Sequence, residues 1–179
     1  MKVGIISIGD ELMNGFTVDT NSAWISKKIY FYNQLIVSAN VIVGDCSNQI
    51  LDSLDSLINQ NYKYIFISGG LGPTHDDITK KTLCQYFNCK TQLRNDLYQK
   101  LKKILKEKGI KDVKHLKEQC EILENSSPII NQKGTALGMY IENRLCKIFI
   151  MPGVPNEMEI MFENQIIPKF IDPYFQKIK

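Results

Sequence analysis

The sequence predicts one α/β domain in which helices cover both sides of a mostly parallel sheet. Short runs of β-branched residues alternate with segments of helical periodicity along most of the chain. The length of 179 residues and the hydrophobic content of 44% fit one core, and two full domains would be cramped. No internal repeat or low-complexity linker divides the chain. We therefore expect a single domain over residues 1–179.

Three strands and a late hairpin are expected. Val3 to Ile8 is almost wholly apolar, which is typical of a strand buried on both faces. Apolar residues recur at every second position from Leu35 to Val43, and Tyr64 to Ile67 forms the third strand. Met139 to Ile141 and Lys147 to Met151 flank a short polar turn, which predicts a hairpin.

Helices are expected between and after these strands. Asp19 or Thr20 is placed to cap the first helix, and Ser47 to cap the second. The later helices are expected at Thr79 to Phe87, Arg94 to Lys108 with a stop at Gly109, Val113 to Cys120, and from Asn156 to Phe162. The basic run from Lys100 to Lys117 is interpreted as a solvated helical face.

Composition excludes several classes of protein. The 22 basic and 19 acidic residues are too evenly balanced to indicate a nucleic-acid-binding protein. Five cysteines without a C-x-x-C pair argue against a disulfide framework and a structural zinc site. The N-terminal apolar run is too short for a secretory signal or a membrane span, so we expect a cytoplasmic protein without a membrane partner.

Four polar loops are expected to meet in one crevice. In an open parallel sheet, ligands bind outside the carboxyl ends of the strands. The loops with this position are Gly9 to Glu11, Gly44 to Asp45, Gly69 to Asp77 and Pro152 to Glu157. A ligand site built from these loops is therefore predicted.

The glycine-rich loop is suited to a phosphate group. Gly69, Gly70 and Gly72 allow a turn with exposed amides, and the helix that follows adds its positive end. The loop lacks the third glycine of the dinucleotide motif and the lysine and hydroxyl pair of the ATP-binding P-loop. A plain strand-to-helix connection fits the glycines about as well as an anion site does.

Carboxylates beside this loop favour a divalent cation. Asp76 and Asp77 would repel an anionic ligand unless a cation of the Mg²⁺ type lay between them, although both also suit a helix cap. Asp45 follows the second strand, where it fits either a site or a turn. Asp10 and the stretch that includes Asn21 fit metal ligands or sugar-hydroxyl acceptors, or a turn and a helix cap.

These motifs together resemble the molybdopterin-binding fold family, most closely the N-terminal domains of CinA-type competence/damage-inducible proteins. The matching stretches are IGDELMNG from Ile8, DTN from Asp19, VGD from Val43, SGGLGPTHDDIT from Ser68, GTALG from Gly134 and MPGVPNEM from Met151. The resemblance implies a three-layer α/β/α sandwich. It departs from the family at Leu137, where proline is common, and in the absence of the deamidase domain with which CinA proteins usually continue.

The resemblance also implies a function and a set of site residues. CinA-type domains are associated with metal-dependent hydrolysis of nucleotide pyrophosphates such as ADP-ribose, and a similar domain with hydrolysis of FAD. The expected hydrolase would use a divalent cation on Asp77, Asp76 and Asp45, with Asp77, Asp45 and Glu157 as catalytic residues. The residues expected to bind the nucleotide or its phosphates are Gly69, Gly70, Gly72, Thr74, Asp10, Asn21 and Gly153.

Two alternatives remain open at this stage. Relatives of the MogA and MoaB type bind molybdopterin and adenylylate it, but they have arginine where this chain has Asp76. The other alternative is a nucleotide-binding module without catalysis. In each case the expected partner is a nucleotide, dinucleotide or pterin, and the family resemblance implies a homo-oligomer, either a dimer or a trimer.

Overall fold

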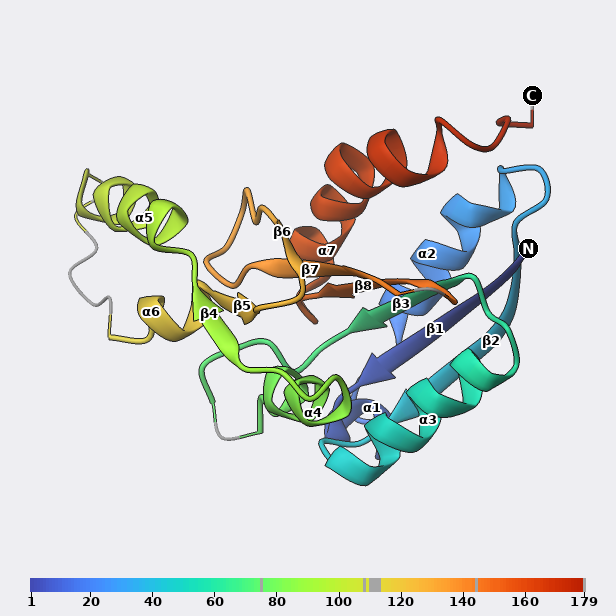
Figure 1. Ribbon diagram of the computed structural model, residues 1–179, viewed down its shortest axis with the longest axis horizontal. Helices are drawn as coiled ribbons and strands as arrows, with labels where there is room; N and C mark the ends of the chain where they lie inside the picture. Colours follow the sequence, from blue (N-terminus) through green and yellow to red (C-terminus); the bar gives the residue numbers. More distant parts are fainter. Residues whose placement is uncertain (75, 108, 110–113, 144, 179) are drawn as a thin grey trace.

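A mostly parallel sheet forms the centre of the molecule (Figure 1). The computed structural model describes residues 1–74, 76–107, 109, 114–143 and 145–178. The strand order is β2-β1-β3-β8-β7-β6, in which the first four strands are parallel and the last two antiparallel. The strands are β1 (Lys2–Ile8), β2 (Ile36–Val43), β3 (Tyr64–Ser68), β6 (Ser127–Ile129), β7 (Gly138–Glu142) and β8 (Lys147–Met151).

Helices cover the two faces of this sheet and enclose separate cores (Figure 1). On one face α3 and α4 bury aliphatic side chains such as Leu54 and Leu83. On the other, α2, α7 and the π-helical segment η1 enclose an aromatic cluster in which Phe66 lies 5.2 Å from Phe149 and 5.1 Å from Phe162, between ring centroids. The helices are α2 (Thr20–Tyr30), α3 (Ser47–Asn59), α4 (Thr79–Tyr86), α7 (Pro155–Met161) and η1 (Phe162–Ile171). The predicted three-layer sandwich is confirmed.

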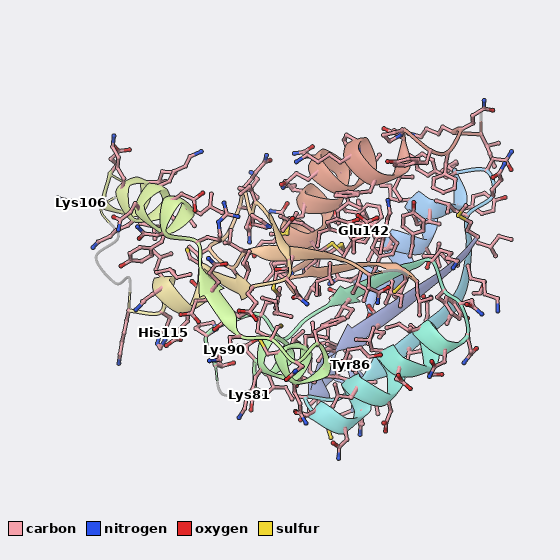
Figure 2. All side chains as sticks on the ribbon, viewed as in Figure 1. Lys81, Tyr86, Lys90, Lys106, His115 and Glu142 are labelled. Atoms are coloured by element: carbon pink, nitrogen blue, oxygen red, sulfur yellow. The ribbon has the colours of Figure 1, made fainter. Side chains whose placement is uncertain are left out.

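A smaller lobe lies beside the sheet, between α4 and β6 in the sequence. It consists of a two-stranded sheet and two helices, namely β4 (Thr91–Leu93), β5 (Glu121–Leu123), α5 (Asn95–Glu107) and α6 (Leu116–Gln119). The lysines of α5 are exposed, whereas Leu97, Leu101 and Leu105 are partly buried, as predicted for a solvated face. Lys90 and Lys106 of this lobe, and Lys81 of α4, project from the surface (Figure 2).

Most predicted elements are confirmed, and the differences are local. The first carboxyl-end loop contains a short helix, α1 (Asp10–Met13). The final helix extends beyond Phe162 as η1, and β4, β5 and β6 were not predicted, because three-residue strands leave little periodicity to detect. The beginning of the helix expected from Val113, and Lys108 at the end of the one before it, lie outside the described residues.

One of the two expected helix caps is confirmed and the other is wrong. Asp19 caps α2 by accepting a bond from the Ser22 amide, as predicted. Ser47 is wrong as a cap, because the cap position of α3 is Cys46 and the Ser47 hydroxyl instead contacts the Thr82 hydroxyl. All five cysteines are free, and no helix in the described chain is long and apolar enough to cross a membrane.

Candidate functional site

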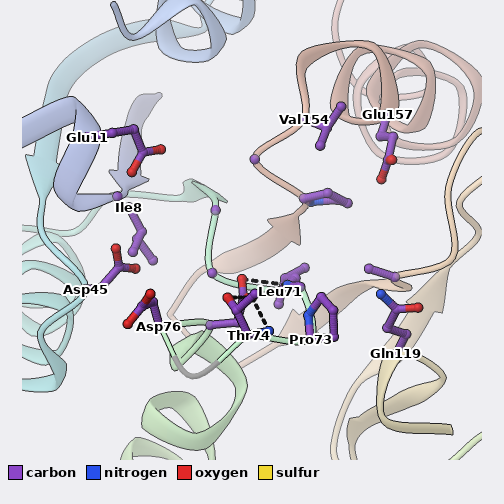
Figure 3. Close-up of a pocket in the computed structure, with 18 of the residues that line it drawn as sticks. Ile8, Glu11, Asp45, Leu71, Pro73, Thr74, Asp76, Gln119, Val154 and Glu157 are labelled. Carbon is purple, nitrogen blue, oxygen red and sulfur yellow. Dashed lines mark hydrogen bonds between the residues drawn. The ribbon is translucent and has the colours of Figure 1, made fainter. Parts of the chain in front are cut away.

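The four predicted loops do meet at one edge of the sheet. Because β1, β2, β3 and β8 are parallel, their carboxyl ends lie side by side. The loops after them line a pocket of about 690 Å³, shown in Figure 3. Gln119, Thr135 and Ala136 complete the lining from outside these loops. The topology thus assembles residues that are more than one hundred positions apart in the sequence.

Asp10 and Asp45 connect the loops after β1 and β2. The Asp10 amide donates to Asp45 Oδ2 at 3.0 Å, and the Asp45 amide donates to Asp10 Oδ1 at 3.0 Å. Burial raises the pKa of Asp45, the bond from the Asp10 amide lowers it, and the charges of Asp10, Glu11 and Asp76 raise it. These four carboxylates are the acidic cluster of the pocket, and Figure 3 shows Glu11, Asp45 and Asp76 facing the same space.

Asp77 points away from this cluster and into its own loop. Its carboxylate accepts bonds from the Gly72 amide at 2.7 Å, from the Thr74 amide at 2.8 Å and from the Thr74 hydroxyl. Neither Asp76 nor Asp77 caps α4, whose cap position is Ile78. The helix-cap alternative is therefore wrong, and Asp77 instead closes the glycine-rich loop. His75, which lies in the same loop, is outside the described residues.

The glycines allow this loop to pass close to its neighbours. Gly69 has φ +115°, and a Cβ at this position would lie 2.2 Å from the Ile8 carbonyl oxygen. The buried Thr79 hydroxyl donates to the Gly69 carbonyl at 3.0 Å and holds the loop against α4. Within the described chain, the Gly70 and Leu71 amides have no hydrogen-bond acceptor, and both residues line the pocket. These two amides are among the open donors of the loop's described residues.

Asn21 joins the start of α2 to the ends of β3 and β8. Its side-chain amide donates to the Ser68 hydroxyl at 2.7 Å and to the Gly153 carbonyl at 2.8 Å. The residue is only 8% exposed, and its Oδ1 atom is buried with no partner among the described residues. Asn21 therefore fixes the position of two loops of the pocket.

Glu157 occupies the end of the pocket opposite the acidic cluster (Figure 3). Its Oε2 accepts a bond of 2.6 Å from the side-chain amide of Asn131. Asn131 is 4% exposed and was missed in the sequence, as were Gln119 and Thr135. The Lys133 amide donates to Asn131 Oδ1 at 3.0 Å, a local turn that an asparagine two residues before a Lys-Gly pair favours.

The charge of the pocket limits what it can bind. Its lining contains six carboxylates and, among the described residues, no lysine or arginine. In the described chain, no three His, Cys, Asp or Glu side chains are grouped so that they could hold a metal ion by themselves. Mg²⁺, however, is commonly held by one or two carboxylates together with substrate phosphates and water. The oxygen donors of Asp45 and Asp76 fit such a shared site.

All predicted site residues therefore lie at or beside one pocket, but in different groups. Asp10, Asp45 and Asp76 form one end with Glu11, whereas Glu157 lies at the other. Gly69, Gly70, Gly72, Thr74 and Asp77 form the loop between them, and Gly153 also lines the pocket. Asn21 lies beneath the Gly153 loop, with which it lines a neighbouring cavity of about 90 Å³. Whether each residue binds a ligand stays a prediction.

Comparison with known proteins identifies the family of the chain. The family described as a probable molybdopterin binding domain matches residues 4–171. A CinA-like protein of Flavobacterium psychrophilum is 35% identical over 175 residues, which cover 97% of the chain and 41% of that relative. A protein of Pyrococcus horikoshii is 36% identical over 185 residues, which cover 98% of the chain and 71% of that relative. The chain thus spans about two fifths of the Flavobacterium relative's length.

Solved structures show the same fold. The protein CinA from Thermoplasma acidophilum superposes with a TM-score of 0.81 at 28% identity, covering 95% of this chain and 97% of that one. The molybdopterin biosynthesis enzyme MoaB from Thermus thermophilus superposes with a TM-score of 0.64 at 17% identity, covering 94% of this chain and 91% of that one. The second likeness extends to the fold alone.

Proposed function

The chain belongs to the family of probable molybdopterin-binding domains and is CinA-like within it, and on this premise we propose that it is a metal-dependent nucleotide pyrophosphatase. Its substrates would be nucleotides with a diphosphate linkage, of the ADP-ribose or FAD type. One observation carries the proposal, namely six carboxylates lining a pocket that also contains open loop amides and, among its described residues, no lysine or arginine. A phosphate group enters such a pocket favourably only when a cation accompanies it.

Different residues of the pocket would bind the metal, bind the phosphates and support the loop. Asp45 and Asp76 would hold the divalent cation, which would supply Lewis acidity and lower the pKa of an attacking water. The Gly70 and Leu71 amides would donate to phosphate oxygens and stabilise the charge that develops there. Asp77, as described, would keep the loop in the shape that presents those amides.

Two roles expected from the sequence do not fit the geometry of the pocket as it stands. Asp77 was expected to ligate the metal, but its carboxylate is engaged by the Gly72 and Thr74 amides, so metal binding would require it to turn. Glu157 was expected to accept the proton of the attacking water. Its position opposite the acidic cluster supports a substrate-binding role better than this one.

A panel of metals and substrates tests the proposal. We expect purified protein with Mg²⁺ or Co²⁺ to release AMP from ADP-ribose or FAD, and EDTA to abolish the release. Asp76→Asn is the sharpest variant, because Asp76 is exposed and its side chain makes no hydrogen bond or salt bridge within the described chain. This variant should lose activity at least tenfold without loss of stability. The exposed Asp52→Asn on α3 is the matched control. No turnover with any dinucleotide would reject a hydrolase.

Binding and adenylylation of molybdopterin form the second candidate. It is favoured by the family's description and would use the same loop for a phosphate group. Asp76 in place of the arginine of MogA-like proteins weighs against it, because a carboxylate repels the phosphate that an arginine would hold. Transfer of AMP from ATP to a molybdopterin acceptor, without AMP release from dinucleotides, would support this candidate. Nucleotide binding without turnover of either kind would indicate a binding module.

A further inference from the structure

The end of the pocket formed by Glu157 has its own chemistry. Glu157 lies on the same side of the pocket as Gln119, across from Asp45 and Asp76 (Figure 3), and Thr135 also lines the pocket. The charges that raise the pKa of Asp45 come from Asp10, Glu11 and Asp76, and Glu157 is not among them. Figure 3 and these charges therefore agree that Glu157 is separate from the acidic cluster.

The Asn131 side chain uses all of its hydrogen-bonding capacity, and one of its bonds holds the Glu157 carboxylate. Its side-chain amide donates to Glu157 Oε2 at 2.6 Å and to the Ala136 carbonyl at 3.1 Å. Its Oδ1 accepts from the Lys133 amide at 3.0 Å and from the Gly134 amide at 2.7 Å. Both donors and both acceptor positions of this buried asparagine are thus occupied, so its side chain is held in one orientation. One residue links the 131–136 loop to α7.

Gly134 lies directly against the same carboxylate. A Cβ at Gly134 would lie 2.3 Å from Glu157 Oε1, so any larger residue at this position would displace the carboxylate. The carboxylate is therefore confined between the Asn131 amide and the Gly134 backbone. A carboxylate that is held in this way already has a fixed orientation in the free protein. Little side-chain conformational entropy is therefore lost when a ligand binds to it.

The ligand group that fits this end must donate hydrogen bonds. A phosphate is excluded because Glu157 would repel it and no described lining residue is a lysine or arginine. A base stacked on an aromatic ring is excluded because no described lining residue is aromatic. Vicinal hydroxyls satisfy the requirement, because a carboxylate accepts from both and the Gln119 and Thr135 side chains can donate or accept.

We infer that Glu157, positioned by Asn131, recognises the vicinal hydroxyls of a ribose, and that the site therefore selects ribonucleotides. The inference rests on the proposed function insofar as the ligand is a nucleotide, but it concerns binding and requires no turnover. A charge-assisted hydrogen bond of this kind corresponds to about a tenfold or larger gain in affinity.

Calorimetric titration of AMP and 2′,3′-dideoxy-AMP, both with Mg²⁺, tests the role of Glu157. Wild-type protein should bind AMP about tenfold or more tightly than the dideoxy form. Glu157→Gln keeps the size of the side chain and removes its charge, so it should reduce this ratio to near one by weakening AMP alone. Glu159→Gln, on the same helix but outside the pocket lining, should leave the ratio unchanged.

Variants of Asn131 separate positioning from general structural damage. Asn131→Asp keeps an acceptor for the Lys133 and Gly134 amides but places a second carboxylate against Glu157. It should weaken AMP binding at least as much as Glu157→Gln does and leave dideoxy-AMP binding unchanged. A purely structural role would weaken the binding of both nucleotides equally, and that result would overturn the role of Asn131.

Three outcomes would overturn the inference as a whole. They are equal affinity of the wild-type protein for the two nucleotides, no AMP binding at millimolar concentration, and binding of 6-methylpterin that Glu157→Gln abolishes. The last result would assign this end to a pterin edge. None of them depends on hydrolysis, so the pyrophosphatase proposal fails separately, by absence of AMP release from dinucleotides. A ribose preference without hydrolysis would support the inference and reject the enzyme.

Discussion

Asp10 and Asp45 hold each other through a reciprocal pair of hydrogen bonds, in which each backbone amide donates to the other residue's carboxylate at 3.0 Å. The pair joins the loops after β1 and β2, and it also brings two negative charges together at the pocket. The bonds fix the two loops relative to each other, but they hold two carboxylates close together. A bound cation would reduce the repulsion between these carboxylates.

Removing the charge of Asp45 should stabilise the metal-free protein at neutral pH. The pKa of Asp45 is raised in the folded state, so the stability associated with its protonated form is present at low pH and is lost as pH rises through that pKa. Asp45→Asn keeps an acceptor for the Asp10 amide. In EDTA its melting temperature should exceed that of the wild type at pH 7, and the difference should disappear towards pH 4. A lower melting temperature at pH 7 would contradict the repulsion.

Removing the Asp77 carboxylate should open the glycine-rich loop. Asp77→Ala removes the acceptor of the Gly72 and Thr74 amides, and it should reduce the free energy of unfolding by about 2 kcal/mol. Thr74→Val removes only the hydroxyl bond and should have a smaller effect. Urea unfolding gives both values. Amide hydrogen exchange should accelerate at Gly72 and Thr74 in the first variant, and unchanged protection there would show that other contacts hold the loop.

Alanine at Gly69 should be far more damaging than alanine at Gly15. Both glycines have positive φ, +115° and +74°, but a Cβ at Gly69 would meet the Ile8 carbonyl at 2.2 Å, whereas nothing lies within 4 Å at Gly15. We expect Gly15→Ala to cost about 1 kcal/mol, from backbone conformation alone. Gly69→Ala should cost roughly 3 kcal/mol or more, because a backbone atom must move. Similar melting temperatures for the two variants would refute the close approach.

Aspartate at position 21 should be less well tolerated than alanine. Asn21→Ala loses the bonds to Ser68 and Gly153, a cost of about 2 kcal/mol. Asn21→Asp also places a buried carboxylate against the Gly153 carbonyl, where no described group donates to it. Its stability should therefore fall below that of Asn21→Ala at pH 7 and recover as pH is lowered. Thermal unfolding from pH 4 to pH 7 measures this, and an order reversed at pH 7 would contradict the proposed contacts.

Removal of the divalent cation should weaken the binding of a phosphate ligand. Because the pocket has six carboxylates and no described cationic side chain, inorganic pyrophosphate should bind at least about tenfold more weakly in EDTA than in Mg²⁺. Asp76→Asn should narrow this difference, and Asp52→Asn should not. Calorimetry at low ionic strength is the suitable measurement. Equal affinity with and without the cation would remove the basis of the metal assignment.

The sequence allowed the fold and the place of the site to be predicted because both depend on local pattern. Val3 to Ile8 and Tyr64 to Ile67 are largely apolar runs, the first followed by Gly9 and Asp10 and the second by Ser68 and the glycine-rich loop, which marks both the strands and the edge with the candidate site. The antiparallel edge strand β6, only three residues long and containing Pro128, carries too weak a pattern.

The roles of individual side chains depended on contacts between distant residues. Asp76 and Asp77 are adjacent and chemically alike, yet one faces the acidic cluster and the other closes its loop. Asn131 was missed because its importance comes from Glu157, twenty-six positions away. The spacing of residues in one sequence does not show which distant side chains will contact each other. In the structure, a buried polar side chain with all its hydrogen bonds made identifies these partners directly.

Under the proposed function, the bonds from Gly72 and Thr74 to Asp77 would also make the loop selective among anions. Any anion that approaches those amides competes with a carboxylate tethered a few residues away, whose effective concentration is at least in the millimolar range. Chloride or acetate at a lower concentration would not displace the Asp77 carboxylate from these amides. A polyphosphate brings several oxygens and its own cation, so it gains contacts that the tethered group lacks. The loop would therefore bind polyphosphates in preference to weak, monovalent anions.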